Sequence, residues 1–265
     1  IFPFLIINSE SNELDLNQSS SYRDLSTQLP FYCIHRVRES LDKYAYSEDF
    51  SSPPYLFAET PSSMFFAIWY LFRAEPFTTL HVSYAQGSVD NPRFDCPDRM
   101  FLSIESMVDL LKNSVRTSSK ETTPEFFNLP AIFVNENDFD LGVTSNDVVV
   151  NDLQFPNWCS NAFSFTTYCR IMLESHYCDE NLNKWIDSLF GVDRRVYKDS
   201  NQSYFIYRQY AYPEIEVEPG SDFSEQIEQQ SIKFGKLPEE IFDRSHPTRR
   251  SFQPKQLHLF KTEKS

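Results

Sequence analysis

A long tract in the middle of the chain, residues 124–156, has neither helical nor strand periodicity. Pro130, Gly142 and clusters of Asn and Asp interrupt it, so we expect extended chain and turns with little regular structure. Buried backbone must find hydrogen-bond partners, and such a tract inside a domain needs side chains that supply them. The chain therefore has to fold around irregular backbone.

Helical patterns precede this tract. Residues 32–44 predict an amphipathic helix, and residues 64–72, MFFAIWYLF, are apolar on all sides and predict a buried helix. Ser62 or Ser63 is expected to cap the buried helix and Pro76 to close it. Asp95 is expected to cap a third helix with Pro97 in its first turn. The apolar stripes of the first and third helices are Ile34, Val37, Leu41 and Tyr44, and Phe101, Ile104, Val108 and Leu111.

Further helical patterns follow the tract. Residues 161–175 predict one helix, and Asp179 is expected to cap the next, which ends at Gly191. Trp185 lies in the middle of the apolar face of this second helix and is expected in the core. Near the end of the chain, residues 222–234 and 238–242 predict two more short helices.

Several sequence strings, in their order along the chain, resemble the BEACH domain. The tract contributes PEFFNLPAIFVNENDFDLG and NDLQFPNW, and MLESHYCDENLNKWIDSLFG follows. The other matching strings are FPFLIINSESNELDLNQSSSYRDLS, YLFRAEPFTTLH, DCPDRMFLSI, FGKLPEEIF and SHPTRR. The resemblance runs from Phe2 to about Arg250.

The chain also departs from the family pattern. Asn183 and Lys184 precede Trp185 where the family usually has L-H-x-W-I-D, and FGVDRR lacks the second glycine of F-G-Y-K-Q-R-G. Residues 236–238 (KLP) replace the usual Q-T-P, and residues 60–63 (TPSS) replace H-Y-S-S. The chain resembles a divergent member.

The resemblance implies a fold and a function. The expected fold is α+β, predominantly helical, with irregular extended core segments. Residues 1–250 would form a BEACH domain that lacks its N-terminal portion, and residues 251–265 a polar tail or linker. The implied function is that of a non-catalytic, protein-binding scaffold in vesicle-mediated membrane traffic, including lysosome-related organelles, autophagy, and membrane fission and fusion. A PH-like domain is expected upstream in the full-length chain, and WD40 repeats downstream.

Composition limits the partners and the compartment. A formal net charge of -14 opposes binding to nucleic acid or to bare anionic lipid. Five irregularly spaced cysteines indicate a reducing environment. The apolar stretches at residues 1–8 and 64–72 are too short to cross a membrane. We therefore expect a cytoplasmic protein without direct membrane insertion, peripheral on endomembranes through its partners.

Catalytic and metal sites have little support in the sequence. Cys159, Cys169, His176 and Cys178 are suitable zinc ligands, but their spacing is wrong for a zinc site. Ser175 and His176 are helix neighbours whose side chains diverge. Glycine-rich phosphate loops and a G-x-S-x-G elbow are absent from the sequence. We expect no catalytic residue, metal or cofactor; the alternatives are an unrecognised hydrolase-type enzyme and a purely structural piece of a larger assembly.

Charged residues inside apolar motifs are the candidate site. They are Arg73, Glu75, Asp98, Arg99, Asp140 and Asp187. Such charges usually form internal ion pairs and caps that hold irregular backbone. Alternatively, some line a groove for a protein partner, and the partner-binding candidates are Glu75, Arg99, Asp140 and Asp187, with Glu75 and Arg99 foremost.

Overall fold

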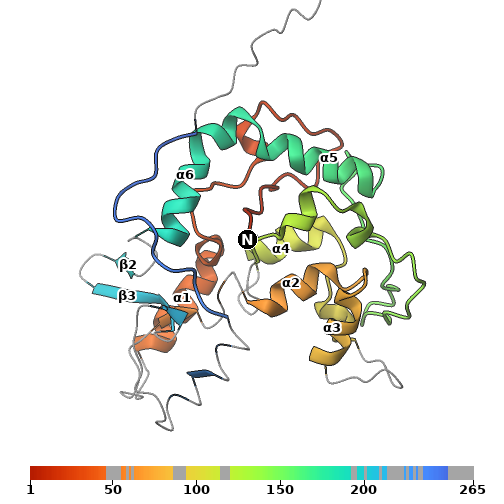
Figure 1. Cartoon of the computed structure of the whole chain (residues 1–265), viewed down its shortest axis with the longest axis horizontal. Coiled ribbons are helices and arrows are strands. Elements are labelled where there is room, and N and C mark those ends of the chain that lie inside the picture. The colour runs from red at the N-terminus through yellow and green to blue at the C-terminus, as the bar shows by residue number, and fades with distance from the viewer. Residues whose placement is uncertain are drawn as a thin grey trace, which may run out of the picture.

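The fold is α+β and predominantly helical, which confirms the expected class (Figure 1). A computed structural model describes residues 1–45, 55–57, 60, 63–85, 94–113, 120–191, 196–199, 202–208, 211–213, 224, 227–228, 231 and 235–249. Within these residues, no helix has both the length and the apolar character needed to cross a membrane.

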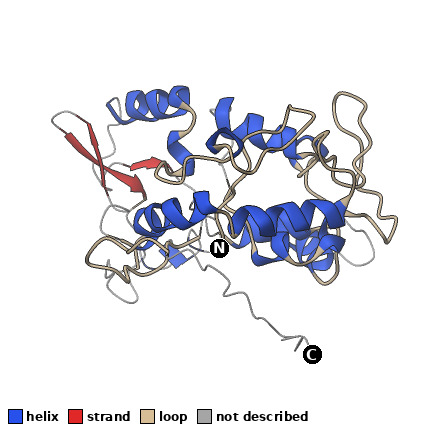
Figure 2. Ribbon diagram, turned by 90° about the horizontal axis from the view of Figure 1, so that it is seen from above, coloured by secondary structure: helices blue, strands red, loops and turns tan. Residues whose placement is uncertain are grey.

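The helices form most of the regular structure (Figure 2). They are α1 (Ile34–Ala45), α2 (Met64–Leu71), α3 (Phe77–Tyr84), α4 (Ile104–Asn113), α5 (Ala162–Leu173) and α6 (His176–Phe190). Short 3-10 helices are η1 (Ser19–Ser21), η2 (Leu29–Phe31), η3 (Pro97–Arg99), η4 (Pro124–Phe127) and η5 (Pro130–Phe133). A small sheet has the order β1 (Tyr55–Phe57), β3 (Gln202–Tyr207), β2 (Val196–Asp199), with β1 parallel and β2 antiparallel to β3.

The central tract is irregular, as its composition predicts. Apart from η4 and η5 it consists of turns and isolated bridges, and its backbone hydrogen-bonds both within the tract and to residues 102–104 before α4 and at its start. Leu153 N donates to Phe133 O at 2.8 Å, and Gln154 N donates to Leu102 O at 2.9 Å. The tract therefore lies within the domain and links its elements.

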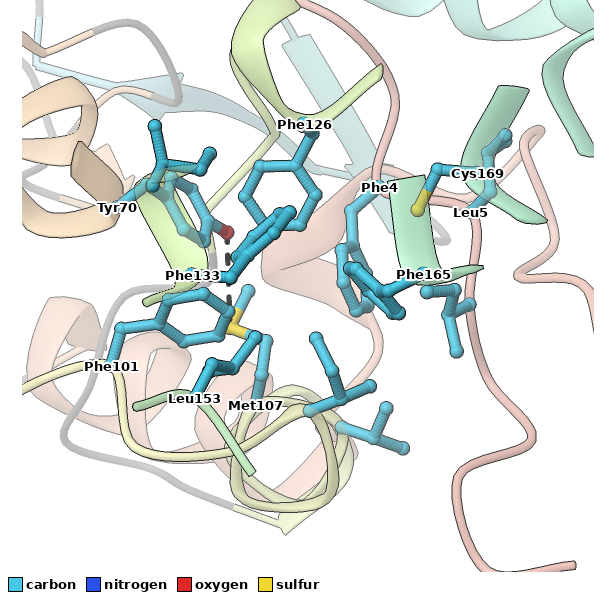
Figure 3. Close-up of a cluster of buried hydrophobic side chains, with 14 of the residues drawn as sticks. Phe4, Leu5, Tyr70, Phe101, Met107, Phe126, Phe133, Leu153, Phe165 and Cys169 are labelled. Atoms are coloured by element: carbon cyan, nitrogen blue, oxygen red, sulfur yellow. Dashed lines mark hydrogen bonds between the residues drawn. The ribbon is translucent and has the colours of Figure 1, made fainter. Parts of the chain in front are cut away.

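Aromatic side chains from the tract and the surrounding helices fill the core (Figure 3). The rings of Phe126 and Phe133 are 5.1 Å apart between centroids, and Phe133 lies 5.1 Å from Phe165 of α5. Tyr70 of α2 contacts Phe126 at 4.8 Å, and its hydroxyl donates to the carbonyl of Lys120. The deep burial expected of α2 is confirmed at Phe66, Ile68, Trp69, Tyr70 and Leu71.

The expectation of a helix capped by Asp95 is wrong. Residues 97–99 form the separate helix η3, whose N-cap is Cys96, and α4 begins only at Ile104. Met100 between them is extended, with φ -77° and ψ 160°. Pairing with Gln154 explains the break, because Ile104 N donates to its carbonyl at 3.2 Å and the neighbouring Ser103 forms a bridge with it.

The expected cap of α6 is also wrong, because the helix begins earlier than the sequence pattern predicted. Ser175 is the N-cap, and its Oγ accepts from Cys178 N at 3.3 Å. Asp179 lies inside the first turn and binds Arg249 instead. The end at Gly191 is confirmed, although its φ of -102° is an ordinary one. Glycine is needed there because a Cβ would lie 2.7 Å from the carbonyl oxygen of Asp187.

Three further expectations need correction. Ile34 of α1 is exposed, whereas Arg36 is buried and donates to Leu110 O. Pro76 is the N-cap of α3, a helix that the sequence pattern did not predict. Residues 238–242 are not helical, because the amides of Ile241 and Phe242 donate to Phe190 O at the end of α6. The helix expected over residues 222–234 lies largely outside the described residues, as does the side chain of Tyr44.

Candidate partner-binding surface

Helix α3, helix η3 and the loop of residues 135–150 form one side of the domain, opposite α6 (Figure 1). Aromatic rings connect these elements through Phe94, which precedes η3. The ring of His81 in α3 lies 5.8 Å from that of Phe94, and the ring of Phe94 lies 6.3 Å from that of Phe139 in the loop. Three of the four expected partner-binding residues, Glu75, Arg99 and Asp140, are on or beside these elements.

Glu75 is exposed just before α3 and caps its first turn. Its carboxylate accepts hydrogen bonds from Thr79 N at 3.3 Å and from Thr79 Oγ1 at 3.0 and 3.1 Å. The negative charge lies near the N-terminus of the helix, where the helix dipole favours it. Glu75 thus orders α3 while its side chain stays open to solvent.

Arg99 ends η3 and pairs with Asp95 of the same turn. The guanidinium side chain is 70% exposed, and the Asp95 side chain only 15%. Asp95 N also donates to His81 Nε2 at 3.1 Å, and burial lowers the pKa of His81, which favours its neutral form as acceptor. Arg99 therefore presents its charge at the surface of a turn that is anchored to α3.

Asp98 joins η3 to the 135–150 loop. Its Oδ1 accepts from Ser145 Oγ at 2.7 Å and from Ser145 N at 3.0 Å. These two hydrogen bonds hold the pKa of Asp98 below its ordinary value, because they stabilise the carboxylate. A second contact lies nearby, since a Cβ on Gly142 would come within 2.8 Å of Pro97 Cγ.

Asp140 shapes the start of a hairpin that spans residues 142–150. Its Oδ1 accepts from Gly142 N at 3.1 Å, and Gly142 has a φ of +87° that disfavours a side chain. Val143 and Val149 then form an antiparallel bridge. Both valines are exposed to solvent, together with Val148.

Asp187 lies apart from the other three, on α6. Its Oδ1 accepts from His246 N at 2.8 Å, and Asn183 Nδ2 donates to His246 O. Arg249 binds Asp179 and donates to Leu173 O at 3.0 Å. Asp187 is therefore half-buried beneath the segment of residues 241–249, and it does not join Glu75, Arg99 and Asp140.

A polar network beside this surface combines Arg73, a charge expected to hold irregular backbone, with Asn135 and Asn151, which were not singled out from the sequence. Asn135 donates from Nδ2 to Phe139 O and to Asn151 Oδ1, both at 2.9 Å. Arg73 donates from Nε to Asn151 O at 2.7 Å and from Nη2 to Phe101 O at 2.8 Å. Burial lowers the pKa of Arg73 to about 9. The Asn and Asp clusters of the tract were the sequence feature that pointed to this network, and their side chains hold the backbone of the tract as expected.

The residues considered for metal binding and catalysis are buried in the core or take part in local helix contacts. Burial raises the pKa of Cys169 and raises that of Cys178 to about 11, which disfavours the thiolate that a metal or a nucleophilic reaction needs. Ser175 caps α6, and His176 Nε2 lies 3.2 Å from the Glu180 carboxylate. No group of three His, Cys, Asp or Glu side chains suited to a metal ion occurs in the described part of the chain.

Comparisons with known proteins agree with the motif order. The family model described as "Beige/BEACH domain" matches residues 1–249. The chain is 33% identical over 254 residues to "BEACH domain-containing protein B" of Arabidopsis thaliana, which covers 94% of this chain and 9% of that protein. It is 32% identical over 259 residues to "BEACH domain-containing protein lvsE" of Dictyostelium discoideum, and the match covers 96% of this chain and 12% of that protein. It is 30% identical over 265 residues to "Putative neurobeachin homolog" of Caenorhabditis elegans, and the match covers 98% of this chain and 10% of that protein. The chain thus spans about a tenth of these relatives.

Proposed function

Because this chain belongs to the BEACH domain family, we propose that it is a non-catalytic, protein-binding module that acts as a scaffold in vesicle-mediated membrane traffic. The family match over residues 1–249 carries this proposal. Residues 1–250 would be the module and residues 251–265 a linker. Lysosome-related organelles, autophagy, and membrane fission and fusion are the proposed settings.

The chemistry of the polar side chains supports binding over catalysis. Asn135, Asn151 and Arg73 direct their hydrogen bonds to backbone or to each other, and so they are engaged in holding structure. Glu75 is bonded to Thr79 and Arg99 is paired with Asp95, so both also hold local structure. Both side chains are nevertheless exposed at the ends of short helices, where a protein partner can reach their charge. The proposed partner is a PH-like domain upstream in the same protein, with WD40 repeats downstream and peripheral association with endomembranes.

A pull-down against the upstream PH-like module, supplied in trans, tests this proposal. Glu75→Ala and Arg99→Ala are compared with the unaltered protein while circular dichroism and melting temperature are followed. Loss of a partnered charge is expected to weaken binding by about 2 to 5 kcal/mol. Asp187→Ala is the control, because Asp187 belongs to α6, which lies across the domain from α3 (Figure 1). Normal binding by both variants, with both melting several degrees lower, would show that these residues are structural.

A further inference from the structure

The hairpin of residues 142–150 exposes a pair of aliphatic side chains. Val150 N donates to Gly142 O and Thr144 N to Val148 O, both at 2.9 Å. This pattern makes Val143 and Val149 a directly opposed, non-hydrogen-bonded pair, so their side chains lie side by side on one face. Val143 is 53% exposed and Val149 67%.

Hydrogen bonds that do not involve the side chains of Val143 and Val149 brace the hairpin. Asp98 fixes Ser145, Asp140 fixes Gly142, and Thr144 Oγ1 accepts from Val148 N at 3.1 Å. The opposed valine pair therefore leaves apolar area uncovered on an ordered element. Apolar area exposed on such an element is available for a partner to cover.

The backbone N–H and C=O groups of Val143 and Val149 are also available for hydrogen bonding. In a non-hydrogen-bonded pair, the N–H and C=O groups of both residues point away from the hairpin. Within the described residues, the amides of Val143 and Val149 donate to no protein group. An extended polypeptide can take up such groups by lying alongside the strand.

The surroundings of the hairpin are acidic. Between Lys120 and Arg170 the sequence contains no Lys, Arg or His. The exposed acidic residues of the loop and hairpin are Glu136, Asp138, Asp140 and Asp147, and the exposed Asp152 follows just after the hairpin. Of the nearby cations, Arg99 is paired with Asp95 and Arg73 is buried. The field around the valine pair therefore favours a cationic partner.

We propose that the hairpin of residues 142–150 docks an extended segment of a partner protein that carries apolar side chains flanked by lysine or arginine. The apolar side chains cover Val143 and Val149, and the basic ones face the acidic loop. This inference rests on the proposed protein-binding function and specifies the surface and the chemistry of the segment bound.

Binding of defined peptides to the intact protein tests the docking site. The probes are a 12-residue peptide of alternating valine and lysine, a counterpart with glutamate for lysine, and a counterpart with serine for valine. We expect fluorescence anisotropy to show at least about tenfold tighter binding of the valine-lysine peptide than of either counterpart. Equal binding of the three peptides, or binding to phosphatidylcholine vesicles without peptide discrimination, would overturn the proposal.

Two sets of variants locate the binding. Val143→Thr with Val149→Thr keeps the β-branched shape, and we expect it to weaken the valine-lysine peptide at least about fivefold. The matched control is Ile34→Thr with Ile171→Thr, at exposed positions of α1 and α5, which should change binding less than about twofold. Equal effects of the two pairs would refute the location.

Neutralising the loop tests the electrostatic part. Glu136→Gln, Asp138→Asn and Asp147→Asn together should weaken the peptide about tenfold at low salt and flatten its salt dependence. Asparagine tolerates the positive φ of 51° at Asp138 and 61° at Asp147. The control combines Glu10→Gln, Glu13→Gln and Glu105→Gln, and an equal effect there would attribute the attraction to net charge alone.

The two proposals fail separately. If the peptides are not discriminated while Glu75→Ala and Arg99→Ala still release the PH-like module, the docking site is refuted and the proposed function stands. If the valine-lysine peptide binds through Val143 and Val149 but the PH-like module does not bind, the docking site stands and the proposed partner is refuted.

Discussion

Arg23 and Glu121, 98 positions apart in the sequence, form an ion pair of 3.0 Å between Nη2 and Oε1 with both side chains almost fully buried (0% and 3% exposed). Their remaining polar atoms are also bonded. Arg23 Nε donates to Phe4 O at 2.6 Å, and Glu121 accepts from Phe4 N at 2.8 Å and from Trp185 Nε1 at 2.9 Å. The pair therefore ties the N-terminal segment to the chain just before the central tract and to α6.

Breaking this pair is expected to destabilise the domain strongly. Glu121→Ala should lower the free energy of unfolding by about 3 to 5 kcal/mol in urea titrations, because it leaves the Arg23 charge buried and unpaired. Glu39→Ala is the control, since the Glu39–Lys43 pair is exposed and should contribute less than about 1 kcal/mol. A double change, Arg23→Met with Glu121→Leu, should cost less than the sum of the single changes; full additivity would contradict coupling between the two residues.

Trp185 makes separable apolar and polar contributions. Trp185→Ala should cost about 3 to 5 kcal/mol of stability, because the side chain is buried. Trp185→Phe keeps most of the apolar contact but removes the donor to Glu121, and should cost about 1 to 3 kcal/mol. Phe163→Ala, at a 73% exposed position of α5, should change stability by less than about 0.5 kcal/mol. A loss under about 1 kcal/mol for Trp185→Ala in denaturant melts would exclude a core role.

Arg249 is expected to fasten residues 241–249 to α6. Arg249→Lys cannot bind Asp179 and Leu173 O together, because lysine lacks the planar fork of donors. We expect hydrogen exchange to accelerate at the amides of Ile241 and His246, which donate to Phe190 O and Asp187 Oδ1. Arg170→Lys, at an exposed position of α5, is the control. Unchanged protection in the Arg249 variant would mean that the other bonds hold the segment alone.

The Asp98–Ser145 contact predicts a pH dependence. The pKa of Asp98 lies below its ordinary value of 3.8 in the folded protein, so the stability it contributes is present above that value and is lost as pH falls through the folded pKa. Ser145→Ala removes the hydroxyl donor and should raise the pKa of Asp98 toward 3.8, measured by NMR titration of its side-chain carboxyl. Ser145→Thr should retain the low value. An unchanged titration in Ser145→Ala would assign the effect to the backbone amide.

The irregular structure of residues 124–156 and the burial of α2 could be predicted from the local pattern of residue types. Prolines, Gly142 and the Asn and Asp clusters exclude regular structure in residues 124–156, and an all-apolar run at residues 64–72 requires burial. The helix predicted over residues 161–175 corresponds to α5, and the end of α6 at Gly191 was likewise visible in sequence. Motif order identified the family without reference to the structure.

The sequence by itself determined the family, the fold class and the irregular tract, because these depend on residue types at short separations. Tertiary structure alone decided that Arg23 pairs with Glu121, that Asp187 lies far from the other candidate residues, and that Val143 and Val149 face solvent. The start of α6 at His176 is set locally by the Ser175 cap, whereas the tertiary structure decided that Asp179 binds Arg249 from a distant part of the chain. Such outcomes depend on which distant segments meet, and the free energy of those contacts outweighs local preference.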